Sequence, residues 1–339
     1  MTQRESNPAG WDSALGAFIA TEAGARRARL ENWRRLVGGA IRENWAVTVT
    51  IAGGPRGGTH ELVLRTDASS LIAESRPLDQ EFALLKAAHG AGVAVPEPFW
   101  HGPDASVIGK PFYLMGRLAG VALGNRIVRD GPNEALAERL AAELAKIHAI
   151  TPPRRDLDFL EPPRDGPALD AVAKYRAHLD REPEPHPALE WGLRWLQTQA
   201  PAAGEIVLAH RDFRTGNYLV DGGRLSGIVD WEFAGWSDPL EDIGWFCARC
   251  WRFGAAGREA GGIARRETFY RAYETASGRA IDRETVPYWE AMAHVRWAII
   301  GLQQTGRHRS GDEPSLELAL IGRRMAELEY ETLGLTGVA

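Results

Sequence analysis

Apolar and polar positions follow two different periods in the first third of the chain. Residues 12–36 carry helical periodicity that ends at Gly38 and Gly39, which predicts one long helix. β-Branched residues then dominate the runs WAVTVTIAG and HELVLRT, on either side of the glycine-rich turn GGPRGG. This composition predicts two strands. A helix followed by strands is therefore expected at the N-terminus.

The next elements are expected to be another helix and two more strands. The segment PLDQEFALLKAAHGAG predicts a helix with Phe82, Leu85 and His89 on one face and Gly90 at its end. Strands are expected around VAVPEPFWHG and PFYLMGRLAG.

Helical patterns dominate the rest of the chain. GPNEALAERLAAELAKIHAI places Leu136, Leu140, Leu144 and Ile147 on one helical stripe. Proline-rich patches bracket a further helix near residues 168–181, and short hairpins interrupt the helices between 208 and 232. The order predicts an α+β, two-lobed, protein-kinase-like fold. A small antiparallel-sheet lobe, 1–117, would bind nucleotide, and a mainly helical lobe, 118–339, would carry the catalytic loop.

Composition and charge narrow the possible partners. With 339 residues, 44% of them hydrophobic and 25% charged, the chain can bury a large core. A net charge of −5, spread along the chain, suggests neither nucleic acid nor an anionic membrane as partner. No apolar run approaches the roughly 18 residues of a membrane span, and the N-terminus lacks the apolar core of a signal peptide. We therefore expect a cytoplasmic protein, whose oligomeric state the sequence does not indicate.

The two cysteines form a C-x-x-C spacing, Cys247 and Cys250. Structural zinc needs four ligands, and the chain has no second cysteine pair. Core packing is therefore the favoured interpretation of two thiols one helical turn apart among Trp and Phe.

The segment HRDFRTGN, residues 210–217, carries the candidate chemistry. Phosphoryl transfer needs a carboxylate to accept the proton of an incoming hydroxyl, and oxygen ligands to hold Mg²⁺ on the phosphates. The H-R-D-x-x-x-x-N spacing supplies Asp212 as the base and Asn217 as a metal ligand. The following hairpin, YLV-DGG-RLSGIVDW, returns the chain so that Asp230 is the second metal ligand.

Two neighbours of the base have alternative interpretations. His210 is expected to brace the loop through hydrogen bonds rather than to react. Arg214 would neutralise charge on the transferring phosphoryl group, as a catalytic residue, or would be an ordinary surface arginine.

Three stretches resemble one known family: HRDFRTGNYLV, GIVDWEFAGWSDPLEDIGWF and GKPFYLMGRLAG. They are similar to the aminoglycoside phosphotransferase and choline-kinase-like family, a branch of the protein-kinase-like superfamily, over residues 33 to 330. The resemblance implies that Asp242 ties the catalytic loop to a following helix. Asp238, before Pro239, is expected to cap that helix.

The same resemblance implies the nucleotide-binding residues. Gly38 and Gly39 would lie in a loop between two strands that covers the phosphates of ATP, although they could equally stop a helix. Arg65 stands where protein kinases carry a phosphate-gripping lysine, and Glu81 would be its ion-pair partner or an acid in the first turn of a helix. Met115 and its neighbours to Leu118 would line the adenine pocket or pack in the core.

The sequence gives the least information about the acceptor, the small molecule that would receive the phosphoryl group. Acidic and basic residues are nearly balanced in 255–339, which argues against a polycationic aminoglycoside. Five arginines beside apolar helix faces would suit an acceptor with apolar and anionic parts, or would be solvated charges: Arg296, Arg307, Arg309, Arg323 and Arg324.

The chain looks most similar to the subgroup of kinase-like domains associated with acyl-CoA dehydrogenases, which implies a hydroxyacyl-CoA or hydroxy-acid acceptor. We therefore predict a Mg²⁺-dependent kinase that transfers the γ-phosphoryl group of ATP to a small-molecule hydroxyl. The alternatives are a non-catalytic nucleotide-binding scaffold, or a true aminoglycoside kinase.

Overall fold

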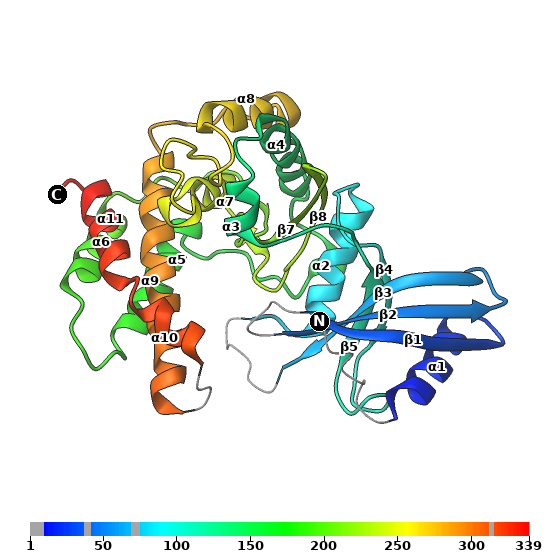
Figure 1. Cartoon of the computed structure of the whole chain (residues 1–339). Helices are drawn as coiled ribbons and strands as arrows, with labels where there is room; N and C mark the ends of the chain where they lie inside the picture. Colours follow the sequence, from blue (N-terminus) through cyan, green and yellow to red (C-terminus); the bar gives the residue numbers. More distant parts are fainter. Residues whose placement is uncertain (1–9, 37–41, 69–74, 312–314, 339) are drawn as a thin grey trace. The chain divides into compact units, whose positions relative to one another are not determined.

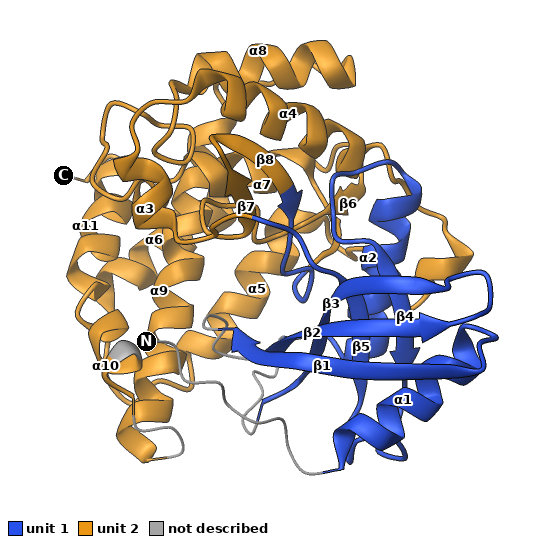
Figure 2. Ribbon diagram, turned by 45° about the vertical axis from the view of Figure 1, so that its right-hand side comes forward, with its two compact units in different colours: residues 1–119, 227–233 blue, residues 120–226, 234–339 orange. Residues whose placement is uncertain are grey.

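The chain divides into two compact units. The computed structural model describes residues 10–36, 42–68, 75–311 and 315–338. Unit 1 consists of residues 1–119 together with 227–233, and unit 2 of residues 120–226 together with 234–339 (Figure 2). The predicted division of labour between 1–117 and 118–339 stays a prediction.

Unit 1 is built on a five-stranded antiparallel sheet with strand order β1-β2-β3-β5-β4 (Figure 1). Its helices and strands are α1 (Trp11–Glu22), β1 (Arg27–Leu36), β2 (Arg42–Ala52), β3 (Gly58–Asp67), α2 (Leu78–Gly90), β4 (Pro98–Gly102) and β5 (Phe112–Gly116). Helix α1 packs along β1, and its residues Trp11, Leu15 and Ile19 join the apolar residues of the strands in one core.

The prediction of one helix over residues 12–36 is wrong beyond Glu22. Gly24 has φ 58°, a left-handed conformation that ends the helical path, and the chain continues as strand β1. In β1, Ala28 and Leu30 are buried while Arg27 and Arg29 are exposed, a period of two that the charged residues obscure in the sequence. Pairing with β2 therefore overrides the apparent helical pattern. The arginines are typical of an edge strand, where charge opposes aggregation.

Helix α2 forms as predicted, but its buried face is rotated from the expected one. Leu85 is buried, whereas Phe82 is only partly buried and His89 is exposed. The buried face runs through Glu81, Leu85 and Ala88, at spacings of four and three, because α2 packs on β4 and β5 along that line.

Unit 2 is mainly helical, with two two-stranded sheets, β6-β9 and β7-β8. Its first elements are α3 (Gly124–Arg129), α4 (Glu134–His148), the 3₁₀-helix η1 (Arg155–Leu157), α5 (Pro167–Leu179), α6 (Pro187–Thr198), β6 (Val207–Ala209), β7 (Tyr218–Asp221) and β8 (Arg224–Ile228). The remaining elements are β9 (Gly235–Ser237), α7 (Pro239–Cys247), η2 (Arg249–Trp251), α8 (Arg266–Ser277), α9 (Val286–Ser310), α10 (Leu316–Gly322) and α11 (Met325–Leu335). Strand β8 ends at Ile228, within the segment 227–233 that groups with unit 1.

The predicted helices of unit 2 are confirmed. All four residues of the predicted α4 stripe are buried, and α5 falls in the region near 168–181. The core of this unit joins apolar residues of α5, α6, α7, α9 and α11. The two cysteines are free and buried, and burial raises the pKa of Cys247 to about 12, as expected for packed, unreactive thiols.

The predicted hairpin is present as β7 and β8. Its turn contains Gly222 and Gly223 at φ 54° and 77°. Two consecutive positive φ angles are typical of the type I′ turn that joins antiparallel strands tightly, and glycine adopts them without steric cost.

Within the described ranges, every helix is too short or too polar to span a bilayer.

Candidate active site

Most of the predicted site residues gather in two clusters, one in each unit. The Asp212 cluster contains Asp212, Arg214, Asn217 and Trp245, all in unit 2. The Arg65 cluster, in unit 1, contains six charged residues of the sheet, α2 and the segment 227–233: Arg42, Arg65, Asp67, Glu81, Asp230 and Glu232.

Asp212 lies in the loop between β6 and β7, and three side chains hold its carboxylate. Oδ1 accepts hydrogen bonds from the indole Nε1 of Trp245 at 2.9 Å and from Nε of Arg214 at 3.1 Å. Oδ2 accepts a hydrogen bond from the amide Nδ2 of Asn217, which also donates to the Asp212 carbonyl at 3.0 Å. The spacing of five residues thus lets Asn217 close the loop upon the carboxylate. Its amide oxygen is the atom that could ligate a metal ion.

Asp242 of α7 fixes the backbone of the loop that carries Asp212. Its two carboxylate oxygens accept the backbone N–H groups of His210 and Arg211, each at 2.7 Å. Arg211 has φ 59°, a left-handed conformation that costs a non-glycine residue about 1–2 kcal/mol. The backbone N–H groups of His210 and Arg211 each donate a charge-assisted hydrogen bond to Asp242, and these two bonds offset that cost. The predicted tie between Asp242 and the loop is confirmed.

Further contacts orient the same carboxylate and helix. His148 Nε2 lies 3.2 Å from Asp242 Oδ2, while His148 Nδ1 lies 2.8 Å from the Tyr273 hydroxyl. Burial opposes ionisation of Asp242, but the contacts with His148 and the His210 N–H leave its pKa below the ordinary value. Asp238 accepts the N–H of Leu240 at 2.7 Å, which confirms it as the cap of α7.

His210 and Arg214, the two predicted neighbours of Asp212, have definite partners. The Asp212 N–H donates to His210 Nδ1 at 3.3 Å, so this fully buried ring braces the loop as expected. The guanidinium carbon of Arg214 lies 4.4 Å from the Trp251 ring centroid, and its side chain is 25% exposed. Arg214 is thus held between an aromatic ring and the carboxylate, unlike a freely solvated surface arginine.

In the Arg65 cluster, Arg65 contacts three carboxylates. Its Nε lies 2.8 Å from Glu81 Oε1, its Nη1 lies 3.0 Å from Asp230 Oδ1, and its Nη2 lies 3.8 Å from Glu232 Oε2. Glu81 also accepts the hydroxyl of Tyr113 at 3.0 Å. The expected pair of Arg65 and Glu81 is therefore present, with two acids of the segment 227–233 added to it.

Arg42, the first residue of β2, is the second cation of this cluster. Its guanidinium lies within 3.5 Å of Glu81 and 3.7 Å of Glu232, and it bonds Asp67. Four carboxylates and two guanidinium groups leave an excess of two negative charges when all are ionised. Burial, with repulsion from Glu81 and Asp230, raises the pKa of Glu232 to about 7, and protonation of Glu232 would reduce this excess.

A divalent cation would neutralise this excess, although within the described residues no group of three or more acidic, histidine or cysteine side chains is arranged to hold a metal ion by itself. Mg²⁺ prefers oxygen ligands and commonly keeps only one or two protein carboxylates beside phosphate oxygens. The Asp230 side chain is 31% exposed and contacts Arg65 through Oδ1. Asp230 has φ 64°, a conformation that aspartate tolerates better than most residues.

Of the other predicted nucleotide-binding residues, the structure describes Met115 but not Gly38 or Gly39. Met115 lies on β5, paired with Val63 and Pro98, and is partly buried. Gly38 and Gly39 lie outside the described residues. The strands β1 and β2 flank them, so the alternative that they end a helix beginning at residue 12 is wrong.

Arg296, one of the five arginines expected either to bind the acceptor or to be solvated, is buried instead. Its guanidinium lies 4.5 Å from the Trp245 ring centroid, and its Nη1 lies 3.5 Å from Glu241 Oε1. Only 7% of Arg296 is exposed, because α9 directs it into the interior of the unit. Arg309 contacts Glu184 in an exposed pair, and Arg324 contacts Glu327.

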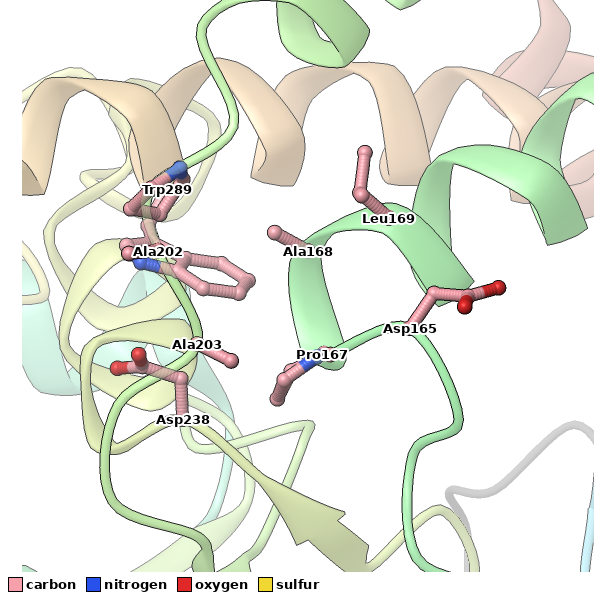
Figure 3. A pocket seen from close by; sticks show the side chains of 10 residues that line it. Asp165, Pro167, Ala168, Leu169, Ala202, Ala203, Asp238 and Trp289 are labelled. Atoms are coloured by element: carbon pink, nitrogen blue, oxygen red, sulfur yellow. The ribbon is translucent and has the colours of Figure 1, made fainter.

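Two hollows adjoin α5. The smaller, about 10 Å³, has Trp289 and Asp238 on one side and the first turn of α5, from Pro167, on the other (Figure 3). It has room for about one water molecule. The larger, about 620 Å³ and open, is lined by residues of α5 and by Asp165, Asp180 and Gln197, a volume typical of small-molecule sites.

Sequence reasoning missed Trp245, Glu232 and Arg42. A usable signal existed for Trp245, because it lies one helical turn after Glu241 and Asp242 and so shares their face of α7. Glu232 follows Asp230 at a spacing of two. Nothing in the sequence pairs Arg42 with these acids.

Comparison with known proteins relates this geometry to one family. A model described as the phosphotransferase enzyme family matches residues 32–283. Mouse (Mus musculus) acyl-CoA dehydrogenase family member 10 is 28% identical over 193 residues, which are 55% of this chain and 18% of that protein. The chain therefore spans less than a fifth of the length of this relative. The family and subgroup resemblance seen in the sequence is confirmed.

Solved structures share the fold. A proposed aminoglycoside phosphotransferase from Ralstonia eutropha superposes with a TM-score of 0.76 at 19% identity, over 96% of this chain and 98% of that one. A choline/ethanolamine kinase family protein from Mesorhizobium loti has a TM-score of 0.56 at 19% identity, over 95% and 98% of the two chains. The predicted kinase-like fold, an antiparallel-sheet unit and a helical unit, is confirmed.

Proposed function

Because the chain belongs to the phosphotransferase enzyme family, we propose that it transfers the γ-phosphoryl group of ATP to a hydroxyl group of a small molecule, with Mg²⁺ as the metal. One observation carries the proposal. The carboxylate of Asp212 is held by three side chains in a loop that Asp242 fixes through the backbone. A carboxylate held in this way is suited to act as a general base, whose value depends on its orientation towards the hydroxyl.

We propose a role for each catalytic and metal-binding residue. Asp212 accepts the proton of the acceptor hydroxyl. Arg214, already bonded to Asp212, neutralises charge on the transferring group. Asn217 and Asp230 are each proposed as magnesium ligands, and the bound ion would neutralise phosphate charge.

The nucleotide residues are proposed on the same basis. Arg65 would grip a phosphate, supported by Glu81, and would exchange Asp230 or Glu232 for a phosphate oxygen. Gly38 and Gly39 are proposed for the phosphate-covering loop, and Met115 for the adenine side.

For the acceptor, we propose a hydroxyacyl-CoA or a related hydroxy acid. The support is the similarity to a protein named as an acyl-CoA dehydrogenase family member. Similarity to a structure described as an aminoglycoside phosphotransferase supports an aminoglycoside as the second candidate. At 19% identity that likeness concerns the fold, so it is the weaker support.

The test is a panel of acceptors with ATP and Mg²⁺. Hydroxyacyl-CoA thioesters, the matching free hydroxy acids, unhydroxylated acyl-CoA and kanamycin would be compared for ADP release, with phosphate-ester formation followed by ³¹P NMR. We expect ester formation with the hydroxylated thioesters and background ADP release with the unhydroxylated control. ADP release with kanamycin alone would favour the aminoglycoside kinase. MgATP binding without ADP release for any compound would favour the non-catalytic scaffold.

A further inference from the structure

The carboxylate of Asp212 depends on its partners for orientation. The terminal torsion of an aspartate side chain is broad and nearly two-fold, so the backbone alone does not decide which oxygen faces a substrate. A carboxylate offers about four acceptor sites, two on each oxygen. The partners of each oxygen therefore decide which one can take a proton.

The two oxygens of Asp212 are occupied unequally. Oδ1 accepts both the Trp245 indole N–H and the Arg214 Nε–H, at 2.9 and 3.1 Å, which accounts for both of its acceptor sites. Oδ2 accepts the Asn217 amide, which accounts for one site. Counting only bonds to the described residues, one acceptor site remains, and it is on Oδ2.

We infer that Trp245 is a positioning residue for the proposed reaction: its indole N–H, together with Arg214, occupies Oδ1 and so reserves Oδ2 for the hydroxyl proton. As the acceptor oxygen bonds to the γ-phosphorus and the bond from that phosphorus to ADP breaks, the hydroxyl proton moves to Oδ2. It then leaves to solvent. The inference rests on the proposed function, because it concerns the base of that reaction.

Trp245 is itself held in place. It is 2% exposed, on the face of α7 that also carries Glu241 and Asp242. Arg296 lies over its ring at 4.5 Å and bonds Glu241 at 3.5 Å. A cation over the ring draws electron density from the indole and should strengthen its N–H as a donor.

The chain offers a matched control. Trp289 on α9 is 1% exposed and belongs to the same core, but its indole Nε1 has no hydrogen-bond partner among the described residues. Trp245→Phe and Trp289→Phe both remove an indole N–H and the same volume from the core. Only the first removes a hydrogen bond to Asp212.

The kinetic test compares these two variants. Trp245→Phe should lower kcat about tenfold to a hundredfold, the range for a hydrogen bond to a charged group, with the KM for ATP unchanged. Trp289→Phe should retain kcat, and it should lose less thermal stability than Trp245→Phe because its indole N–H has no hydrogen bond to lose among the described residues. Equal kcat values in the two variants, with an active parent, would overturn the inference and leave the proposed function standing.

A second readout does not need turnover. In ¹H–¹⁵N spectra of labelled protein, the cross-peaks absent from Trp245→Phe and Trp289→Phe identify the two indoles. Asp212→Asn should move the Trp245 indole proton upfield, because a charged acceptor becomes neutral, and leave the Trp289 peak unchanged. An unmoved Trp245 peak would overturn the inference. If the Trp245 peak moves in Asp212→Asn but the parent phosphorylates no acceptor, the hydrogen bond exists and the proposed reaction does not. The positioning role would then be wrong as well.

Discussion

The Asp212 cluster and the Arg65 cluster hold their carboxylates by different means. In unit 2, the groups bonded to Asp212 and Asp242 are mainly neutral donors: an indole, an amide and two backbone N–H groups. In unit 1, four carboxylates share two guanidinium groups. Neutral donors fix an orientation without adding charge, which suits a base. An excess of carboxylates suits the binding of a cation, because the cation relieves their repulsion.

The largest expected effect concerns this excess charge. Asp230→Ala should weaken Mg²⁺-dependent ATP binding by on the order of 100-fold or more, since loss of an outer-shell partner alone commonly costs 10- to 100-fold. Asp221→Ala is the control, because it removes an exposed carboxylate from β7. Calorimetric titration with ATP and Mg²⁺ measures both. Equal affinities in the two variants would contradict the proposed role of Asp230 as a magnesium ligand, and with it the proposal that the Arg65 cluster helps to bind the cation.

The second effect concerns stability. Glu81 is 1% exposed and contacts both arginines of its cluster, so Glu81→Ala leaves Arg65 and Arg42 short of a counter-charge. We expect a loss of about 3–5 kcal/mol in the free energy of unfolding. Glu61→Ala, which breaks an exposed pair with Arg117, should cost less than about 1 kcal/mol. Denaturant unfolding of the two variants would contradict the account if they lost the same free energy.

The third effect is acid sensitivity in unit 2, where a buried group is held neutral. Burial lowers the pKa of His294 to about 4, and its Nδ1 lies 2.7 Å from the Glu290 carbonyl. The stabilising contribution of the neutral ring is complete above the unfolded pKa of about 6.5 and is lost as pH falls towards 4, a change of roughly 3 kcal/mol. Arg252 and Arg249 oppose its protonation, and Glu327 favours it.

His294→Gln should therefore flatten the dependence of unfolding free energy on pH between 6.5 and 4. Exposed His89 supplies the control variant, His89→Gln. Parallel pH profiles for His294→Gln and the parent would contradict the neutral buried state.

The fold was predicted best from the sequence where the apolar residues of a segment followed a single helical or strand period. The α4 stripe and the strands β2 and β3 were readable because most of their buried positions carry apolar residues, with Arg42, Arg65 and Thr66 as exceptions in the strands. Strand β1 was not, because four of its ten residues are arginines and its pairing with β2 is a tertiary contact. Local spacing likewise indicated Asp212 and Asn217, which bond one another five residues apart.

The long-range members of the clusters could not be predicted in the same way. Trp245 is 33 residues from Asp212, and the sequence connects the two only indirectly, through the helix face that Trp245 shares with Asp242. Arg42 meets Glu81 and Glu232 only through the folded sheet and α2. The burial of Arg296 could not be predicted, because helical periodicity does not reveal which face of a 25-residue helix faces the interior when its apolar residues surround it.

The central claim, that Asp212 is the base of a phosphoryl transfer, is tested most directly by Asp212→Asn. Asparagine keeps the size and most hydrogen bonds of Asp212 but cannot accept the proton. With the acceptor identified by the panel, phosphate-ester formation in a single turnover should fall by roughly 10²- to 10⁴-fold while MgATP binding, measured on the same sample, stays unchanged. Ester formation at the parental rate would contradict the account.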